Sequence, residues 1–346
     1  IYSISWTYDN AGNRATQTKD GNQTSYTYNN MNQMTAAGNI TFTYDSNGNT
    51  ASKTESQATT NYTWGYENRL TKIDNPSGDD PSTTLGVVRL SNHYVYEYDG
   101  DGMRVRSGHD SGQGNVWDTR LYYDTAAPLY SYMFESDNAK NMTVAYTIDP
   151  AGNLISQRRS GATSYHLYDQ LGSTRQLLNA SQVTTDSYSY CAFGEVRTSS
   201  GSTPNPFKFV GQLGYYDDPS TEFDYLRARY YAPAYGRFWT PDPFPERVRP
   251  AYVYAAGSPL GVVDPTGRQG WELAVLHVVY MTAEGREVVV AAIEATHTLG
   301  IRQACAVCNQ WFQRVRAGEE YPWATSMTLV HEVLQRTLYK QEAYIR

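Results

Sequence analysis

Cysteine is scarce in this sequence, with three cysteines among 346 residues. A disulfide framework needs an even set of cysteines at short spacings, and Cys191 lies far from Cys305 and Cys308. Disulfides are therefore not expected to organise the fold, and the cysteines do not indicate a compartment. Long apolar runs are missing as well, because no stretch approaches the roughly 18 apolar residues of a membrane-spanning helix. No transmembrane segment is expected.

Positive charge is also in deficit. The chain has 28 Lys and Arg against 35 Asp and Glu, a net charge of -7. Electrostatic binding to nucleic acids or anionic membranes needs the opposite balance, so neither is expected as a partner.

The first residues lack an initiating Met and the basic and apolar regions of a signal peptide. We expect the chain to be the C-terminal part of a longer polypeptide.

Tyrosine is abundant, and it recurs in a pattern. The chain has 31 Tyr against 9 Phe, together with 27 Gly. Variants of Tyr-Asp-x-x-Gly-Asn-x occur as YDNAGNR from Tyr8, YNNMNQM from Tyr28, YDSNGNT from Tyr44, YENRL from Tyr66, YDGDGMR from Tyr98, IDPAGNL from Ile148, YDQLGST from Tyr168 and YCAFGEV from Tyr190. A repeated motif of this kind indicates a repeat architecture.

Each repeat is predicted to be a β-hairpin. The Asx and Gly residues suit a tight turn, where a left-handed backbone and a side-chain cap are needed. Alternating runs such as TSYTYN and ITFTYD place aromatic residues on one face and hydroxyl residues on the other. A hairpin cannot bury its aromatic face alone, so successive hairpins are expected to share one sheet. The predicted fold class is mainly β, a spiralling antiparallel sheet.

These motifs resemble the YD-repeat family, also called the RHS-repeat family. Further along, the sequence is similar to the core-associated segment of that family in five pieces: YDQLGSTRQLLNASQ, YSYCAFGEV, NPFKFVGQLGYYD, DYLRARYYAPAYGRFWTPDPF and YVYAAGSPLGVVDPTG. The resemblance covers residues 1 to about 268. It implies a β-sheet shell, a core segment that closes one end, and a variable C-terminal domain, frequently a toxin.

The resemblance also implies a site of self-cleavage. The family's internal aspartyl protease corresponds here to Asp242 and Asp264, and the bond cut would be Arg268–Gln269. Aspartyl proteolysis needs two carboxyl groups that share one proton, so that one acts as a base toward water while the other donates. The alternative is that both Asp-Pro pairs only start turns.

The stretch from Phe223 to Phe244 combines tyrosines and arginines densely. Its members Arg227, Arg229, Arg237, Tyr230 and Tyr231 allow two interpretations. Interleaved Arg and aromatic side chains are typical of single-stranded nucleic-acid binding. Arginines that stack on tyrosines and pair with carboxylates also form structural clusters. Because the chain is acidic and has no wider basic stripe, we favour the structural interpretation, a seal at the end of the sheet.

The composition changes after Gly267. Residues 269–346 contain no Asp and a single proline, Pro322, and their apolar spacing predicts three or four helices. We therefore expect three parts: a YD-repeat region at 1–200, a core-associated segment at 201–268 and a helical C-terminal module at 269–346.

The helical module contains one candidate metal site. Cys305 and Cys308 form a C-x-x-C pair, and His297 and His331 would complete a set of four zinc ligands. The alternatives are a redox pair and two small buried side chains. The His331-Glu332 pair lacks the second histidine of a zincin helix, so it does not indicate a metalloprotease. No cofactor is expected elsewhere.

The leading functional hypothesis is a non-catalytic shell or carrier for a C-terminal cargo, as in polymorphic toxin systems. Its partner would be its own C-terminal module. The first alternative is a structural or adhesive surface filament, in which the repeats pair with adjacent subunits of the same protein. The second alternative makes residues 269–346 a small enzyme or toxin domain. An exported bacterial protein, extracellular or at the cell surface, fits each of these hypotheses.

Overall fold

The structure is a computed structural model. It describes residues 3–75, 93–111, 113–127, 129–218, 221–243 and 251–268, and the backbone of 271–272. The chain divides into two compact units, Ile1–Gly270 and Trp271–Arg346. In the second unit the structure describes β24 (Trp271–Glu272). The helices predicted from residue 269 onward lie outside the described residues.

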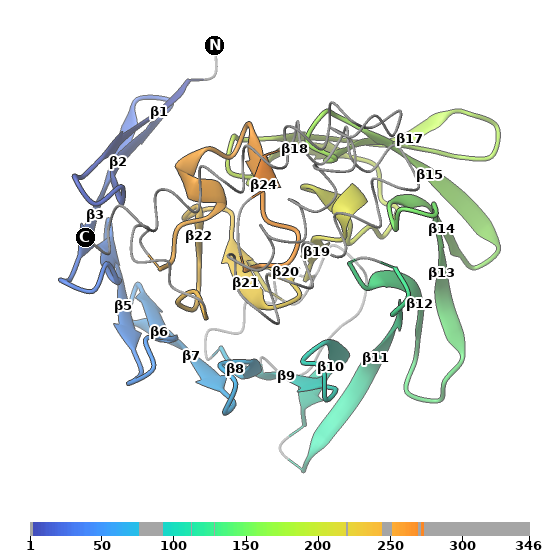
Figure 1. The fold of residues 1–346 in the computed structure, drawn as a ribbon, viewed down its shortest axis with the longest axis horizontal. Coiled ribbons are helices and arrows are strands. Elements are labelled where there is room, and N and C mark those ends of the chain that lie inside the picture. Colours follow the sequence, from blue (N-terminus) through green and yellow to red (C-terminus); the bar gives the residue numbers. More distant parts are fainter. Residues whose placement is uncertain are drawn as a thin grey trace, which may run out of the picture. The chain divides into compact units, whose positions relative to one another are not determined.

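One antiparallel sheet of 18 strands makes up most of the first unit, which confirms the predicted fold class. Each strand pairs with the next in the sequence, so the sheet is a continuous meander that curves around the segment after residue 200 (Figure 1). We call this sheet the wall. Its strands are β1 (Ile4–Tyr8), β2 (Arg14–Lys19), β3 (Asn22–Tyr28), β4 (Met34–Ala37), β5 (Ile40–Tyr44), β6 (Thr50–Glu55), β7 (Ala58–Trp64), β8 (Leu70–Asp74), β9 (His93–Tyr98), β10 (Arg104–Asp110), β11 (Asn115–Asp124), β12 (Ser131–Ser136), β13 (Met142–Ile148), β14 (Leu154–Arg159), β15 (Ala162–Tyr168), β16 (Thr174–Leu178), β17 (Thr184–Tyr190) and β18 (Val196–Ser200).

The repeat motif forms the hairpin turns by the predicted chemistry. In the first repeat, the Oδ1 atom of Asp9 accepts the N–H groups of Ala11 at 2.9 Å and Asn13 at 2.8 Å. Gly12 has a φ of 80°, the left-handed conformation for which glycine is suited. The same side-chain cap recurs at Asn29, Asp45, Asp99, Asp149, Asp169 and Asn179.

The predicted position of the fourth repeat, which began at Tyr66, is wrong. Its turn runs from Gly65 to Arg69, whose main-chain groups are joined at 2.7 Å, so Trp64 occupies the position of the repeat tyrosine. The strand register also shifts between Thr63 and Trp64, as it does before the tyrosine of other repeats. Tyr66, which begins YENRL, lies fully exposed at the tip of the turn. Two aromatic residues stand close together here, and the pattern YENRL begins at the second of them.

The repeat aromatics form a ladder of hydrogen bonds that links successive repeats. Each polar group donates to the main-chain carbonyl of the residue that begins the second strand of an earlier hairpin. The bonds are Tyr28 to Arg14, Tyr44 to Met34, Trp64 to Thr50, Tyr98 to Leu70, Tyr123 to Arg104, Tyr168 to Leu154 and Tyr190 to Thr174, all between 2.6 and 2.9 Å. Phenylalanine cannot donate such a bond, which explains why these positions carry tyrosine or tryptophan.

We expect Tyr168→Phe to lower the free energy of unfolding by about 1 kcal/mol, because the Leu154 carbonyl loses its donor. Urea unfolding followed by fluorescence measures the change. Tyr66→Phe is the matched control, since Tyr66 is fully exposed. Equal effects of the two substitutions would show that the ladder does not stabilise the wall.

The outer face of the wall is rich in hydroxyl groups. Cross-strand pairs join Thr7 to Thr16 at 2.7 Å and Thr43 to Ser52 at 2.6 Å. Similar exposed pairs are Thr27 with Thr35 and Ser189 with Thr198. The inner face carries aromatic and aliphatic side chains such as Phe42, which is buried. The predicted division of the hairpins into an aromatic and a hydroxyl face is therefore confirmed.

The core segment, residues 201–268, lies against the inner face of the wall. Its elements are β19 (Tyr216–Asp217), β20 (Asp224–Leu226), β21 (Arg229–Ala232), β22 (Arg237–Phe238), β23 (Val262–Val263) and the 3₁₀ helices η2 (Gly211–Leu213) and η3 (Ala255–Gly257). Strands β19–β22 form a small antiparallel sheet. The contacts with the wall are aromatic: Trp239 meets Phe42 at 5.7 Å between ring centroids, and Phe207 meets Tyr132 and Tyr146 at 5.0 Å each. The wall and the core segment thus share one hydrophobic core.

Candidate functional site

The two candidate protease residues meet at one arginine. Nη2 of Arg229, at the start of β21, lies 3.3 Å from Oδ2 of Asp242 and 3.2 Å from Oδ2 of Asp264. Asp242 follows β22, the last strand of the small sheet, and Asp264 follows β23, which lies outside that sheet. The resemblance implied that the two carboxyl groups lie close together, and it gave no indication of the arginine that contacts both.

The three groups differ in burial. The side chains of Arg229 and Asp264 are 3% and 1% exposed, whereas that of Asp242 is 20% exposed. Burial lowers the pKa of the Arg229 guanidinium, and the two carboxylates act in the opposite direction. The arrangement can therefore present one buried carboxylate and one that water reaches, both fixed by the same cation.

Asp264 also organises the end of the core segment. Its Oδ1 accepts the main-chain N–H of Arg268 at 3.0 Å, and its own N–H donates to the Tyr215 hydroxyl at 2.7 Å. Gly267 has a φ of 67°, and a Cβ there would lie 2.4 Å from the Leu226 carbonyl oxygen. Asp264 is thus a turn residue, as the alternative interpretation required, and it also contacts Arg229. The two roles are compatible.

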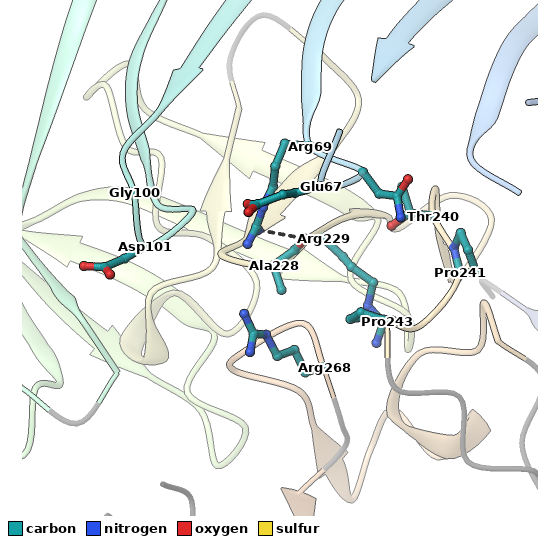
Figure 2. Close-up of a pocket in the computed structure, with 11 residues that line it drawn as sticks. Glu67, Arg69, Gly100, Asp101, Ala228, Arg229, Thr240, Pro241, Pro243 and Arg268 are labelled. Carbon is teal, nitrogen blue, oxygen red and sulfur yellow. Dashed lines mark hydrogen bonds between the residues drawn. The ribbon is translucent and has the colours of Figure 1, made fainter. Parts of the chain in front are cut away.

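A half-open cavity of about 300 Å³ lies beside this site (Figure 2). Arg69 comes from the wall and donates to the carbonyl oxygens of Arg227 at 3.0 Å and Ala228 at 3.2 Å. Burial lowers the pKa of Arg268, and nearby Arg69 lowers it further. The cavity is lined by Glu67, Asn68, Arg69, Gly100, Asp101, Ala228, Arg229, Thr240, Pro241, Pro243 and Arg268. The last residue before the candidate bond therefore borders a space that water can enter.

The other members of the arginine and tyrosine stretch are buried in the core segment. Arg227 donates to the Pro265 carbonyl at 2.5 Å, and Arg237 donates to the Asn32 carbonyl at 2.7 Å. The Arg237 guanidinium also lies 5.1 Å from the Tyr28 ring centroid and 4.9 Å from that of Tyr252. Tyr230 and Tyr231 are 2% and 0% exposed. These side chains join the core segment to itself and to the wall.

Sequence reasoning missed the role of Arg69. It stands at the turn position that Asn13, Asn49 and Asn153 occupy in other repeats, where a side chain reaches back to the capping Asp. In this turn the capping position is Gly65, which has no carboxyl group, and Arg69 extends to the core segment instead. The arginine at a position where other repeats have asparagine was the sequence signal that could have indicated this contact.

The remaining predicted site residues lie outside the described residues. These are Gln269, His297, Cys305, Cys308 and His331, so the zinc hypothesis stays a prediction. Within the described part of the chain, no group of three or more His, Cys, Asp or Glu side chains is arranged to hold a metal ion. None of the helices in that part has the length and hydropathy needed to cross a membrane.

Comparisons with known proteins identify relatives of the first unit. A family model described as teneurin YD-shell matches residues 3–255. The tRNA3(Ser)-specific nuclease WapA of Bacillus spizizenii is 31% identical over 277 residues, and the tRNA nuclease WapA of Bacillus subtilis is 30% identical over the same length. Each match covers 78% of this chain and 11% of the relative. Salivary gland surface protein 1 of Aedes aegypti is 32% identical over 149 residues, 40% of this chain and 4% of that protein.

Solved structures with a similar trace include two crystal structures of complexes, TcdB2-TccC3-Cdc42 and TcdB2-TccC3. Both are 14% identical and cover 77% of this chain and 17% of the matched chain, with TM-scores of 0.45 and 0.44. The chain spans about a tenth of the length of the first two curated relatives and about a sixth of these solved chains.

Proposed function

The chain belongs to the teneurin YD-shell family, and on this premise we propose that residues 1–268 form a non-catalytic shell or carrier for a cargo module at 269–346. Within it, residues 1–200 serve as the wall and 201–268 as the segment that closes it. The observation that carries this proposal is the shared aromatic core, in which Trp239 and Phe207 of the core segment pack on the inner face of the wall. Such packing suits a closed inner surface rather than a ligand-binding groove.

A toxin-related cargo is supported by the relatives. Two of them are named tRNA nucleases and are about 30% identical over most of this chain. We infer that the wall of this chain carries a toxin-related cargo, in an exported protein that acts outside the cell that makes it. Residues 269–346 would then be the cargo or a part of it, and this module would be the partner of the shell.

Particle imaging of the full chain tests the carrier against the filament alternative. A carrier is expected to give discrete particles in negative stain. An enclosed module is also expected to resist trypsin: cleavage at the arginines of 269–346 should be slow in the folded protein and faster after urea has unfolded the wall. Linear polymers, or a module that trypsin removes at the same rate in both states, would contradict enclosure and favour the surface filament.

Self-cleavage after Arg268 is the second function we propose. The contact of Asp242 and Asp264 with one Arg229 nitrogen supports it, as does the hydrogen bond from the Arg268 N–H to Asp264. In the proposed hydrolysis, the more exposed Asp242 takes a proton from a water molecule whose oxygen attacks the Arg268 carbonyl carbon. A proton on Asp264 passes to the departing nitrogen of Gln269 as the C–N bond breaks. Arg229 positions both carboxyl groups.

Asp264→Asn is expected to abolish the cut, so that intact-mass measurement finds one full-length species where the unsubstituted protein gives two fragments. Asp224→Asn is the matched control. Asp224 is a buried aspartate of the same core segment that takes no part in the proposed hydrolysis, and burial raises its pKa well above the usual range. A single uncut mass for the unsubstituted chain would overturn self-cleavage and leave the shell proposal intact.

A further inference from the structure

One turn of the wall is fastened to the core segment by four hydrogen bonds. The Thr174 hydroxyl donates to the Phe207 carbonyl at 2.6 Å, and the Thr174 N–H donates to the Lys208 carbonyl at 2.8 Å. The Val210 N–H donates to the Ser173 hydroxyl at 3.1 Å, and the Gln212 N–H donates to the Gly172 carbonyl at 3.0 Å. We call residues 172–174 with 207–212 the latch.

A buried histidine supports the latch from the neighbouring strand. His166 in β15 is 7% exposed, and its Nδ1 lies 3.2 Å from the Thr174 hydroxyl oxygen. The single hydrogen of that hydroxyl is used toward Phe207. Nδ1 must therefore carry the hydrogen that Thr174 accepts, which assigns the tautomer. Nε2 is then the bare nitrogen, and it is buried with no hydrogen-bond partner among the described residues.

The surroundings of His166 offer no compensation for a positive charge. On its own strand, the Tyr168 ring stacks against it at 5.8 Å between centroids. From β16 it meets Thr174, which is neutral. Burial alone lowers the pKa of His166 to about 4 from 6.5, without a contribution from any charged group.

The charged groups on the strands packed around His166 have partners of their own. Arg158 of β14 donates to Thr163, and Arg159 of β14 donates to Tyr146. Asp186 of β17 stands opposite Leu177, the cross-strand partner of His166, and accepts the Thr203 N–H at 2.8 Å.

Arg175, the charged residue beside Thr174 on β16, lies over the Tyr190 ring at 5.9 Å. In the core segment, Lys208 is paired with Asp217 at 2.5 Å. A proton added to Nε2 of His166 would thus create a buried cation with neither a counter-charge nor an acceptor.

We propose that His166 makes the latch acid-sensitive, so that protonation of Nε2 releases turn 172–174 from residues 207–212 and separates the wall from the core segment at this point. The open latch exposes the imidazole to water and lets it take the proton at its ordinary pKa. The inference rests on contacts between wall and core segment alone. It holds whether or not residues 269–346 are a cargo.

The direction and size of the effect follow from linkage. The closed latch binds the proton more weakly than the open one, so its stability is complete above pH 6.5 and is lost as the pH falls from 6.5 toward 4. The equilibrium constant for opening is expected to rise about 30-fold between pH 8 and pH 5.

Hydrogen exchange of the full chain, corrected for the intrinsic pH dependence of exchange, tests the proposal. The amides to follow are those of Thr174, Val210 and Gln212, which the latch protects. His166→Gln keeps an N–H donor for Thr174 but cannot ionise. His109→Gln is the matched control, because His109 is a partly exposed histidine paired with Asp118 at 3.0 Å.

Protection of these amides is expected to fall about 30-fold from pH 8 to pH 5 in the unsubstituted protein and in His109→Gln, and to stay nearly constant in His166→Gln. An unchanged pH response in His166→Gln would overturn the proposal. Proton NMR of the six histidines in the unsubstituted chain gives a check that needs no variant. One imidazole is expected to titrate near pH 4, and ordinary titration of all six would contradict the latch.

Discussion

Replacing Asp218 by asparagine is expected to lower the free energy of unfolding by about 3–5 kcal/mol, because it leaves a buried arginine without its counter-charge. Asp218 is the ion-pair partner of Arg104, and the two side chains are 3% and 1% exposed. Arg104 begins β10 in the wall, whereas Asp218 belongs to the core segment. The ion pair therefore joins the two parts across their common interior.

The surroundings of Arg104 explain why the loss should be large. Its guanidinium lies 4.6 Å from the ring centroid of Tyr225 and 5.2 Å from that of Tyr96, and its Nη1 donates to the Tyr230 hydroxyl at 3.2 Å. These rings favour a cation but do not neutralise it. Once Asp218 is neutral, water cannot reach the charge to replace the carboxylate.

Glu97→Gln is the matched control for this prediction. Glu97 pairs with Arg106 at 2.5 Å on the wall, where the two side chains are 39% and 26% exposed. An exposed pair contributes about 0–1 kcal/mol. Urea unfolding with fluorescence and circular dichroism gives both values. Equal losses for Asp218→Asn and Glu97→Gln would mean that burial adds nothing to the Arg104 pair.

Trp239→Ala is expected to cost about 3–5 kcal/mol, the range for removal of a large buried aromatic side chain. Trp239 is 1% exposed and packs on Phe42 and Tyr62 of the wall and on Phe223 and Tyr235 of the core segment. Alanine leaves a cavity that these rings cannot fill, because each is held by its own strand or turn.

Leu260→Ala serves as the control for Trp239→Ala, since Leu260 is a large apolar residue of the core segment that is 72% exposed. It is expected to change stability by no more than about 0.5 kcal/mol. If Trp239→Ala unfolds at the same urea concentration as the unsubstituted chain, the core segment does not stabilise the wall. That result would also weaken the carrier proposal.

The wall was predictable because its determinants are local. Asp9, Gly12 and Asn13 lie within one turn, and the chemistry of that turn is independent of the rest of the chain. Alternation along each strand then selects the buried face. The exception is the fourth repeat, in which Trp64 fills the position of the repeat tyrosine.

The candidate site was predictable only in part, because its geometry depends on long-range contacts. The resemblance to YD-repeat proteins named Asp242 and Asp264. Arg229 contacts both carboxyl groups because the chain from β21 to β23 folds back on itself. No local sequence pattern encodes that path. His166 gave no signal in the sequence at all, because its significance arises from a single neighbouring hydroxyl, that of Thr174.

The ladder of repeat aromatics gives the wall a direction of growth. Each hydroxyl finds its acceptor in a hairpin that precedes it in the chain, as Tyr168 does at Leu154. A hairpin that emerges from a ribosome or an export channel can therefore make this hydrogen bond at once, although its aromatic face is covered only by the core segment that follows. The acceptor is always a main-chain carbonyl, so any repeat can succeed any other. Walls of this kind can be lengthened or shortened by whole hairpins during evolution, because each remaining repeat aromatic still finds a main-chain carbonyl as its acceptor.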